Sequence, residues 1–230
     1  IIEIAVKECS GKIPVIAGTG SNSTDEAIEL SKFAEKARSD ALLVVTPYYN
    51  KPTQEGLYQH YKKINDNVGI PIIIYNIPSR SVIDMSVNTM SKLYELKNIV
   101  GVKDATGDLD RVDQQLKAMG KEFIQLTGND DNSLEFNKRG GVGSISVTAN
   151  IAAKYCSDFQ KACINNFAKA EEIDKKLQPV HSAMFIESNP SPVKYAASLL
   201  EMCKPFVRLP LVEVREEKKN KISKALKVAK

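Results

Sequence analysis

The stretch Ile99-Val100-Gly101-Val102-Lys103 is a short apolar run that ends in a lysine. Similar runs recur along the chain, with starts separated by 20 to 30 residues: Pro14–Gly18, Ala41–Val45, Pro71–Tyr75, Phe123–Thr127 and Gly143–Ser146. Short, nearly continuous apolar runs are typical of strands in a parallel sheet that is covered on its faces. The pattern therefore predicts six parallel strands.

Helical patterns fill the spaces between these runs, and after Ser146 only helical patterns follow. The expected helices are Thr24–Lys36, Gln54–Val68, Ser86–Leu96, Leu109–Met119, Ala152–Ile164, Phe167–Met184, Pro192–Leu200 and a basic terminal helix within Glu213–Lys230. Alternating strands and helices predict an α/β fold. We expect residues 1–150 to form a (β/α) barrel domain and residues 151–230 to form helices that complete it and extend it. A doubly wound sheet fits the same spacing.

The placement of polar residues favours the barrel. They follow the ends of four successive runs, in the segments Thr46 to Asn50, Tyr75 to Arg80, Lys103 to Gly107 and Thr127 to Asp131. Barrel active sites are built from several strand ends in this way, whereas an open sheet concentrates its site at one switch point. A closed barrel has eight strands, so we expect two βα units, roughly 60 residues, to be missing at the N-terminal side.

Composition narrows the class of protein. Of the 230 residues 43% are hydrophobic and 26% are charged, and no apolar run approaches the length of a membrane span. The net charge of +4 is concentrated in Glu213–Lys230, which has no aromatic residues between its lysines, so we expect no nucleic-acid partner. The start of the chain does not resemble a signal peptide, and the four cysteines form no CxxC pair. We expect free, mostly buried thiols and a cytoplasmic protein.

Other site types have weak support. The two histidines, His60 and His181, have no cysteine or carboxylate partners at ligand spacing, so we expect no metal and place both on helix surfaces. The glycine-rich stretches Ala17–Gly20 and Arg139–Gly143 do not match a phosphate-binding loop. They are better interpreted as tight turns at strand ends.

Lys103 is the first candidate for chemistry. Alternate residues of a strand share a face, so Lys103 points with Ile99 and Gly101. If that face is the barrel interior, desolvation disfavours the ammonium form, and the neutral amine can attack a carbonyl to form an imine. The alternative is a lysine that ends a strand and reaches solvent.

Three further candidates lie at neighbouring strand ends. Tyr75 could relay protons, or be a half-buried core tyrosine. Arg80 follows the rigid Pro78 and could bind a carboxylate, or lie on a surface loop. Tyr48 and Tyr49 diverge in an extended loop, so we expect them to serve different places, with packing at a subunit or loop contact as the alternative.

The chain resembles the dihydrodipicolinate synthase family of pyruvate-dependent class I aldolases, from Lys12 to the C-terminal helices. The resemblance is carried by the segments IPVIAGTGSNST, VTPYYNKPTQEGLYQHY, YNIPSR, VGVKDATG, GSISVTAN, NPSPVKYA and RLPL. It implies a (β/α)₈ barrel with a helical extension, usually a homotetramer built as a dimer of dimers. The substrates would be pyruvate and L-aspartate 4-semialdehyde, with no cofactor beyond the imine on the enzyme.

The resemblance also implies residue roles. Lys103 would form the Schiff base with pyruvate, and Tyr75 and Tyr49 would belong to a proton relay, with Tyr49 donated across a dimer interface. Arg80 would bind the carboxylate of the semialdehyde, and it separates this family from the sialic acid lyase branch. The backbone of Gly128 and Ile145 would line the pyruvate end.

Three more residues, Asn22, Glu26 and Tyr48, match positions that bind the feedback inhibitor lysine in some members. The chain departs from the family in lacking the GTTGE segment, which supplies the relay threonine. We therefore expect an N-terminally incomplete chain that is not fully active alone. The alternatives are another pyruvate aldolase or lyase acting on a sugar acid, an inactive truncated member, and a binding module that retains the lysine site.

Overall fold

The computed structural model describes residues 1–227, so the last three residues of the predicted basic helix lie outside the described part. The chain forms two compact units. The first comprises Ile1–Gly128 and Arg139–Val142, and the second comprises Asn129–Lys138 and the chain from Gly143 onward. The domain division expected near residue 150 stays a prediction.

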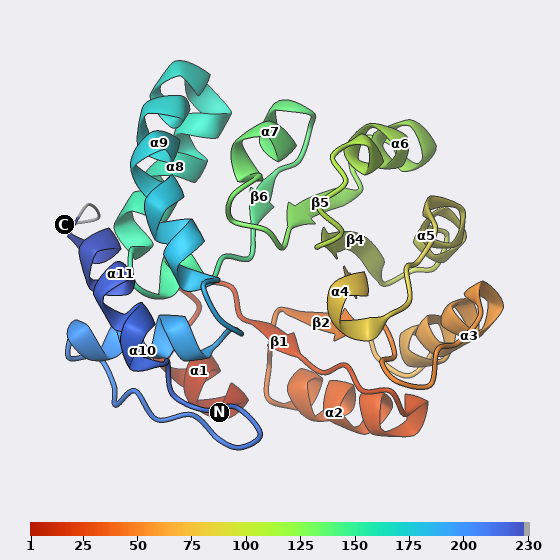
Figure 1. Cartoon of the computed structure of the whole chain (residues 1–230). Helices are drawn as coiled ribbons and strands as arrows, with labels where there is room; N and C mark the ends of the chain where they lie inside the picture. Colours follow the sequence, from red (N-terminus) through yellow and green to blue (C-terminus); the bar gives the residue numbers. More distant parts are fainter. Residues whose placement is uncertain (228–230) are drawn as a thin grey trace. The chain divides into compact units, whose positions relative to one another are not determined.

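The first unit contains five strands: β1 (Ile16–Gly18), β2 (Ala41–Val45), β3 (Ile72–Asn76), β4 (Ile99–Asp104) and β5 (Ile124–Thr127). Neighbouring strands are parallel and follow one another in chain order. A doubly wound sheet would reverse this order at a switch point, so the observed order excludes it for these strands. The order is that of a singly wound (β/α) barrel, with the helices following the curve of the sheet (Figure 1).

The helices of the first unit connect these strands: α1 (Ile2–Cys9), α2 (Thr24–Lys36), α3 (Gln54–Asn65), α4 (Pro78–Ser81), α5 (Val87–Tyr94) and α6 (Asp110–Met119). Three of them begin at a side-chain cap, because Ser23, Thr53 and Ser86 accept hydrogen bonds from backbone N–H groups of the first turn. Helices α1 and α4 are not among the helices expected from the sequence. Helix α1 has eight residues, none of them buried, and α4 is a single turn with proline at its start, which is too short to show an apolar period.

The two faces of the sheet differ, as strand alternation requires. Leu42, Val44, Ile72, Ile74 and Val102 pack into one buried cluster with residues of α2, α3 and α5. The Tyr61 hydroxyl of α3 donates to the Val44 carbonyl at 2.7 Å and ties helix to sheet. The opposite face therefore presents the alternate residues, among which are Tyr75 and Lys103.

The second unit is mainly helical: α7 (Ser133–Lys138), β6 (Gly143–Ser144), the 3₁₀ helix η1 (Thr148–Asn150), α8 (Ala153–Asn165), α9 (Phe167–Met184), α10 (Ser191–Leu199) and α11 (Glu216–Leu226). Its two apolar cores centre on Met184 with Ile222 and on Phe159 with Leu177. Strand β6 is shorter than predicted because the chain turns into η1, where the Ser146 hydroxyl accepts from the Ala149 N–H.

Two expectations about burial were wrong. His60 and His181 are 5% and 4% exposed, not on helix surfaces. One nitrogen of each ring has a threonine partner, because Nδ1 of His60 lies 2.9 Å from Thr24 Oγ1 and Nδ1 of His181 lies 2.7 Å from Thr148 Oγ1. The Nε2 atom of His60 is buried without a hydrogen-bond partner among the described residues. Of the four free cysteines, Cys163 is buried and Cys203 is exposed, while the other two are partly buried.

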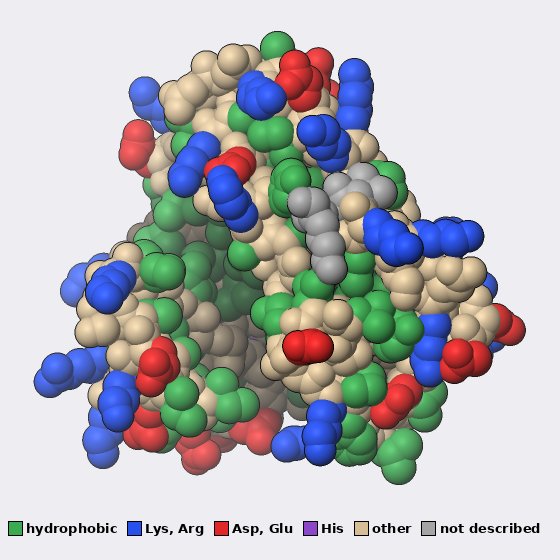
Figure 2. All heavy atoms as spheres, turned by 90° about the vertical axis from the view of Figure 1, so that its left-hand side faces the viewer, with side chains coloured by type: hydrophobic (Ala, Val, Ile, Leu, Met, Phe, Trp, Pro, Cys, Tyr) green, Lys and Arg blue, Asp and Glu red, His purple; other side chains and the backbone are tan. Residues whose placement is uncertain are grey.

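Among the described residues, no helix is long and apolar enough to cross a membrane, and no group of three or more His, Cys, Asp or Glu side chains could hold a metal ion. Basic and acidic side chains are interspersed on the face shown in Figure 2.

Candidate active site

Lys103 and Tyr75 lie side by side at the carboxyl ends of β4 and β3. The two residues are register partners, and Nζ of Lys103 lies 4.0 Å from the centre of the Tyr75 ring. Lys103 is only 9% exposed although it bears an amine. The strand order thus places a buried amine against a phenol, with Gly101 below Lys103 on the same face.

Burial raises the pKa of Tyr75, and the positive charge of Arg80 opposes this rise. The phenol therefore stays protonated through the neutral range and is available as a proton donor. Tyr75 and Arg80 line one pocket of about 430 Å³, together with Tyr48 and residues of β1, β2 and α4. The structure thus brings Tyr75, Arg80 and Tyr48 to one pocket of the first unit.

Gly128 packs closely against the end of β4 and the Lys103 side chain. A Cβ at Gly128 would lie 2.7 Å from Cβ of Ala105 and 3.0 Å from Cε of Lys103, which is closer than ordinary contact. The Gly128 N–H donates to the Asp104 carbonyl at 2.7 Å, so the backbone is held against the end of β4. The absence of a side chain at residue 128 thus leaves room for the lysine.

Tyr49 occupies an unusual backbone conformation. Its φ is 72°, and the Asn50 N–H donates to the Tyr48 carbonyl at 2.9 Å across it. This is the rare γ-turn with positive φ, which is strained for a residue with a side chain. The turn leaves Tyr49 87% exposed. Within the first unit the Tyr49 side chain therefore lies in solvent.

Of the residues Asn22, Glu26 and Tyr48, Asn22 is bound to the loop that contains Tyr48. The Asn50 side chain donates to the Asn22 carbonyl at 2.9 Å, which fixes the tyrosine loop against the start of α2. Glu26 accepts a short hydrogen bond from the Ser21 hydroxyl. Two carboxylate or amide groups and a phenol thus lie on neighbouring segments of the first unit.

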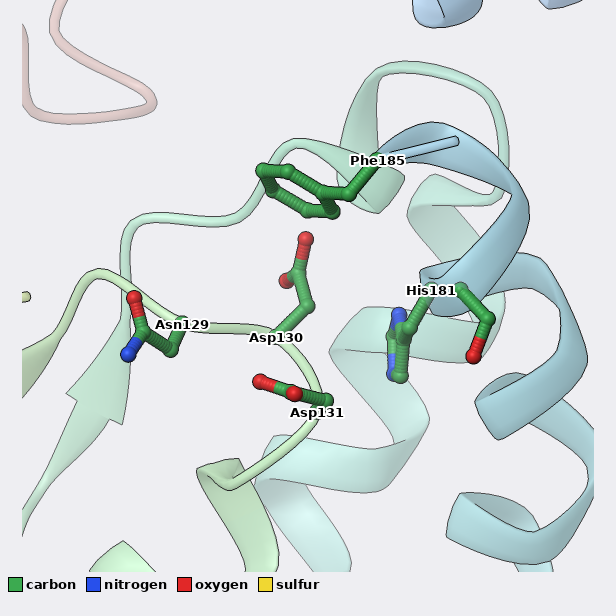
Figure 3. A pocket seen from close by; sticks show the side chains of 6 residues that line it. Asn129, Asp130, Asp131, His181 and Phe185 are labelled. Atoms are coloured by element: carbon green, nitrogen blue, oxygen red, sulfur yellow. The ribbon is translucent and has the colours of Figure 1, made fainter. Parts of the chain in front are cut away.

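Ile145 belongs to the second unit, directly after β6. The segment that follows it is held by Asp130, whose Oδ2 accepts from the N–H groups of Val147 and Thr148 at 2.9 and 3.0 Å. Asp130 lines a pocket of about 280 Å³, in which its side chain points toward the ring of Phe185 (Figure 3). Asp130 thus fixes the backbone next to Ile145.

The site residues predicted from the sequence do not include the buried polar residues behind the strand ends, on the face of the sheet that the helices cover. Asp104 and Arg111 are both buried, and Arg111 Nε lies 3.0 Å from Asp104 Oδ2. The available signal was the acidic residue directly after Lys103, since alternation turns it toward the helices. A carboxylate in that position needs a partner, and the next helix supplies it.

The architecture is that of an α/β protein with a buried lysine and a tyrosine side by side at the carboxyl ends of neighbouring parallel strands. Residues 1–229 match the model of the dihydrodipicolinate synthetase family. The chain belongs to this family.

The chain is similar to several known members. It is 72% identical to the 4-hydroxy-tetrahydrodipicolinate synthase of Pelagibacter ubique, covering 98% of this chain and 78% of that protein. The pyruvate complex of the chloride-inhibited dihydrodipicolinate synthase from Acinetobacter baumannii is 44% identical and has a TM-score of 0.97, with 100% of this chain and 79% of that chain covered. The lysine-bound enzyme from Cyanidioschyzon merolae is 33% identical, with a TM-score of 0.94 over 99% of this chain and 78% of that one.

Proposed function

We propose that the protein is a lyase that condenses pyruvate with L-aspartate 4-semialdehyde to give 4-hydroxy-tetrahydrodipicolinate, the first committed step of diaminopimelate and lysine biosynthesis. The observation that carries the proposal is the buried Lys103 amine, 4.0 Å from the Tyr75 ring centre, in a chain of this family. The names of the similar proteins and the pyruvate complex of one of them support the substrate assignment.

The chemistry follows from the residues. Nζ of Lys103 adds to the keto carbon of pyruvate, and loss of water gives an imine, for which the Tyr75 phenol donates the proton to the leaving hydroxyl. Removal of a proton from the methyl carbon gives an enamine, which attacks the aldehyde carbon of the semialdehyde. The amino group of the adduct then displaces Lys103 from the imine and closes the ring.

The other site residues bind the substrates and complete the proton relay. Arg80 lines the pocket beside Tyr75, and its guanidinium suits the semialdehyde carboxylate. The backbone of Gly128 and of Ile145 receives the pyruvate carboxylate. Tyr49 completes the proton relay of a neighbouring subunit, which its exposure and strained backbone favour. No cofactor takes part other than the covalent imine itself.

We also propose a regulatory site and an assembly. Asn22, Glu26 and Tyr48 bind lysine as an effector, in line with the lysine-bound relative. The protein forms a homotetramer, a dimer of dimers, in the cytoplasm. Its full architecture is a closed (β/α)₈ barrel with a C-terminal helical extension, with residues 1–150 in the barrel.

Steady-state assays test the proposal. With pyruvate present, the protein should turn over L-aspartate 4-semialdehyde and leave sugar acids untouched. Preferential turnover of a sugar acid would assign another pyruvate aldolase activity instead. Calorimetry that detects lysine binding in a protein without pyruvate turnover would favour a binding module.

A further inference from the structure

The catalytic candidates at the ends of β3 and β4 each precede a buried polar residue on the opposite face. Asn76 follows Tyr75, and Asp104 follows Lys103, and the two are register partners. Because successive side chains of a strand alternate, these residues lie behind the site, toward the helices. Any group that binds both can set the relative position of the two strand ends.

The Asp104 carboxylate is fully hydrogen-bonded. Oδ1 accepts from the N–H and hydroxyl of Thr106 at 2.9 and 2.6 Å, and Oδ2 accepts from Arg111 Nε at 3.0 Å and Gln115 Nε2 at 3.1 Å. The charge of Asp104 is therefore neutralised by Arg111 within the protein. A buried carboxylate that is paired and hydrogen-bonded in this way has little freedom to move.

Arg111 reaches a second segment with the rest of its guanidinium. Nη2 donates to the Met85 carbonyl at 2.8 Å, and Nη1 lies 3.4 Å from Asp84 Oδ2. Asn76 holds the same segment, because its Nδ2 donates to Asp84 Oδ1 at 2.7 Å and its Oδ1 accepts from the Met85 N–H at 3.1 Å. Residues 84 and 85 are thus bound both to β3 and, through Arg111, to β4.

This segment anchors the helix that carries Arg80. Helix α4 is a single turn that ends at Ser81, and the capping residue Val82 has φ of 69°. Ser81 is its one buried residue, so the turn has little packing of its own and depends on its ends for its position. One end is β3, and the other is the segment that Arg111 and Asn76 hold.

Resting on the function proposed above, we propose that Arg111 is a positioning residue that fixes Arg80 relative to Lys103 and so sets the affinity for the semialdehyde. Its planar fork serves Asp104 and Met85 at once, which the single ammonium of a lysine cannot do. Arg111 touches no reacting atom. Its role is to keep the carboxylate-binding arginine at the correct distance from the imine.

The test is the Arg111→Lys variant of the full chain, assayed with both substrates. Lysine keeps the positive charge for Asp104 but gives up the contacts to residues 84 and 85. We expect KM for the semialdehyde to rise about tenfold, because a small misplacement of a binding group is costly. The rate of borohydride trapping with pyruvate should stay within about twofold of the parent rate, since Lys103 itself is undisturbed.

Two further variants make the result decisive. Asp84→Asn, at a half-exposed side chain, should raise the semialdehyde KM in the same direction, and it stands in if Arg111→Lys fails to fold. Arg139→Lys is the control, because Arg139 also pairs with carboxylates of α6, Asp110 and Asp113, but at the surface.

Unchanged semialdehyde KM in both Arg111→Lys and Asp84→Asn would overturn the inference, as would a parallel loss of pyruvate trapping. A parent protein without synthase activity would instead overturn the proposed function.

Discussion

Gly128→Ala is the change that most directly probes the space around the Lys103 side chain. The new Cβ would lie 3.0 Å from Cε of Lys103 and 2.7 Å from Cβ of Ala105, where ordinary contact begins at 3.4 Å. The lysine must therefore shift by roughly 0.4 Å or more, and its neighbour by more than that. Ala105 lies on the backbone that continues β4, so it cannot yield as easily as the lysine.

The expected stability cost is moderate. Overpacking costs about 1–3 kcal/mol, and the reduced freedom of the unfolded chain returns about 0.4–1 kcal/mol of this. A net loss of about 1–2 kcal/mol lowers Tm by about 2–8 °C for a domain of this size. The variant should therefore fold, and its chemistry can be measured.

The expected chemical effect is larger than the stability effect. Displacement of the amine from its place beside Tyr75 should slow imine formation about ten- to hundredfold. The assay is the single-turnover rate of borohydride trapping with saturating pyruvate, followed by mass spectrometry. Gly56→Ala, on α3, is the matched control and should trap pyruvate at the parent rate. Equal trapping rates in Gly128→Ala and the parent protein would refute the reasoning.

The other predictions concern the relay, the subunit contact, pH and the Ile145 loop. Tyr75→Phe should lower kcat by about 10²-fold or more in steady-state assays, with Lys103 still labelled on long incubation; an unchanged kcat would remove Tyr75 from the relay. Tyr49→Gly should stabilise the chain by about 1 kcal/mol in urea titrations by relieving positive φ, yet lose activity; full activity would exclude the donated tyrosine. Burial lowers the pKa of His60 to about 4 from 6.5. The unfolded chain therefore binds the proton first as pH falls below 6.5, and the folded state loses up to about 3 kcal/mol by pH 4. His60→Asn should reduce the change of the urea unfolding midpoint between pH 7 and pH 5, and an equal pH dependence in the variant and the parent protein would contradict the attribution of this change to His60. Asp130→Ala should cost about 1–3 kcal/mol and raise KM for pyruvate, because two N–H groups beside Ile145 lose their acceptor; an unchanged KM would separate Asp130 from the site.

The sequence predicted the strands well, for a physical reason. Strands Ile72–Asn76 and Ile99–Asp104 are buried on both faces, so each begins with a nearly continuous apolar run, and such runs are visible without a structure. The order of the strands in the sheet was not visible in the sequence, because a barrel and a doubly wound sheet have the same spacing between their apolar runs. The pairing of strands that are distant in the sequence distinguishes the two folds.

The sequence also indicated that Lys103 and Tyr75 lie at neighbouring strand ends, because both are polar residues that end apolar runs. It did not indicate the buried polar residues on the opposite face of these strands. Arg111 resembles any charged residue on an amphipathic helix, and only the fold shows that it is buried against Asp104. The same reason explains the error about His60 and His181, since a helical period does not reveal that both rings are buried and that a threonine from another element contacts Nδ1 of each.

The proposed reaction depends on an imine between Lys103 and pyruvate. Borohydride reduction of the protein with pyruvate, followed by peptide mapping, detects this imine. We expect one added pyruvate-derived group on the peptide that contains Lys103, and none in a Lys103→Arg variant. Labelling of another lysine, or no labelling of a folded protein that turns over both substrates, would contradict it.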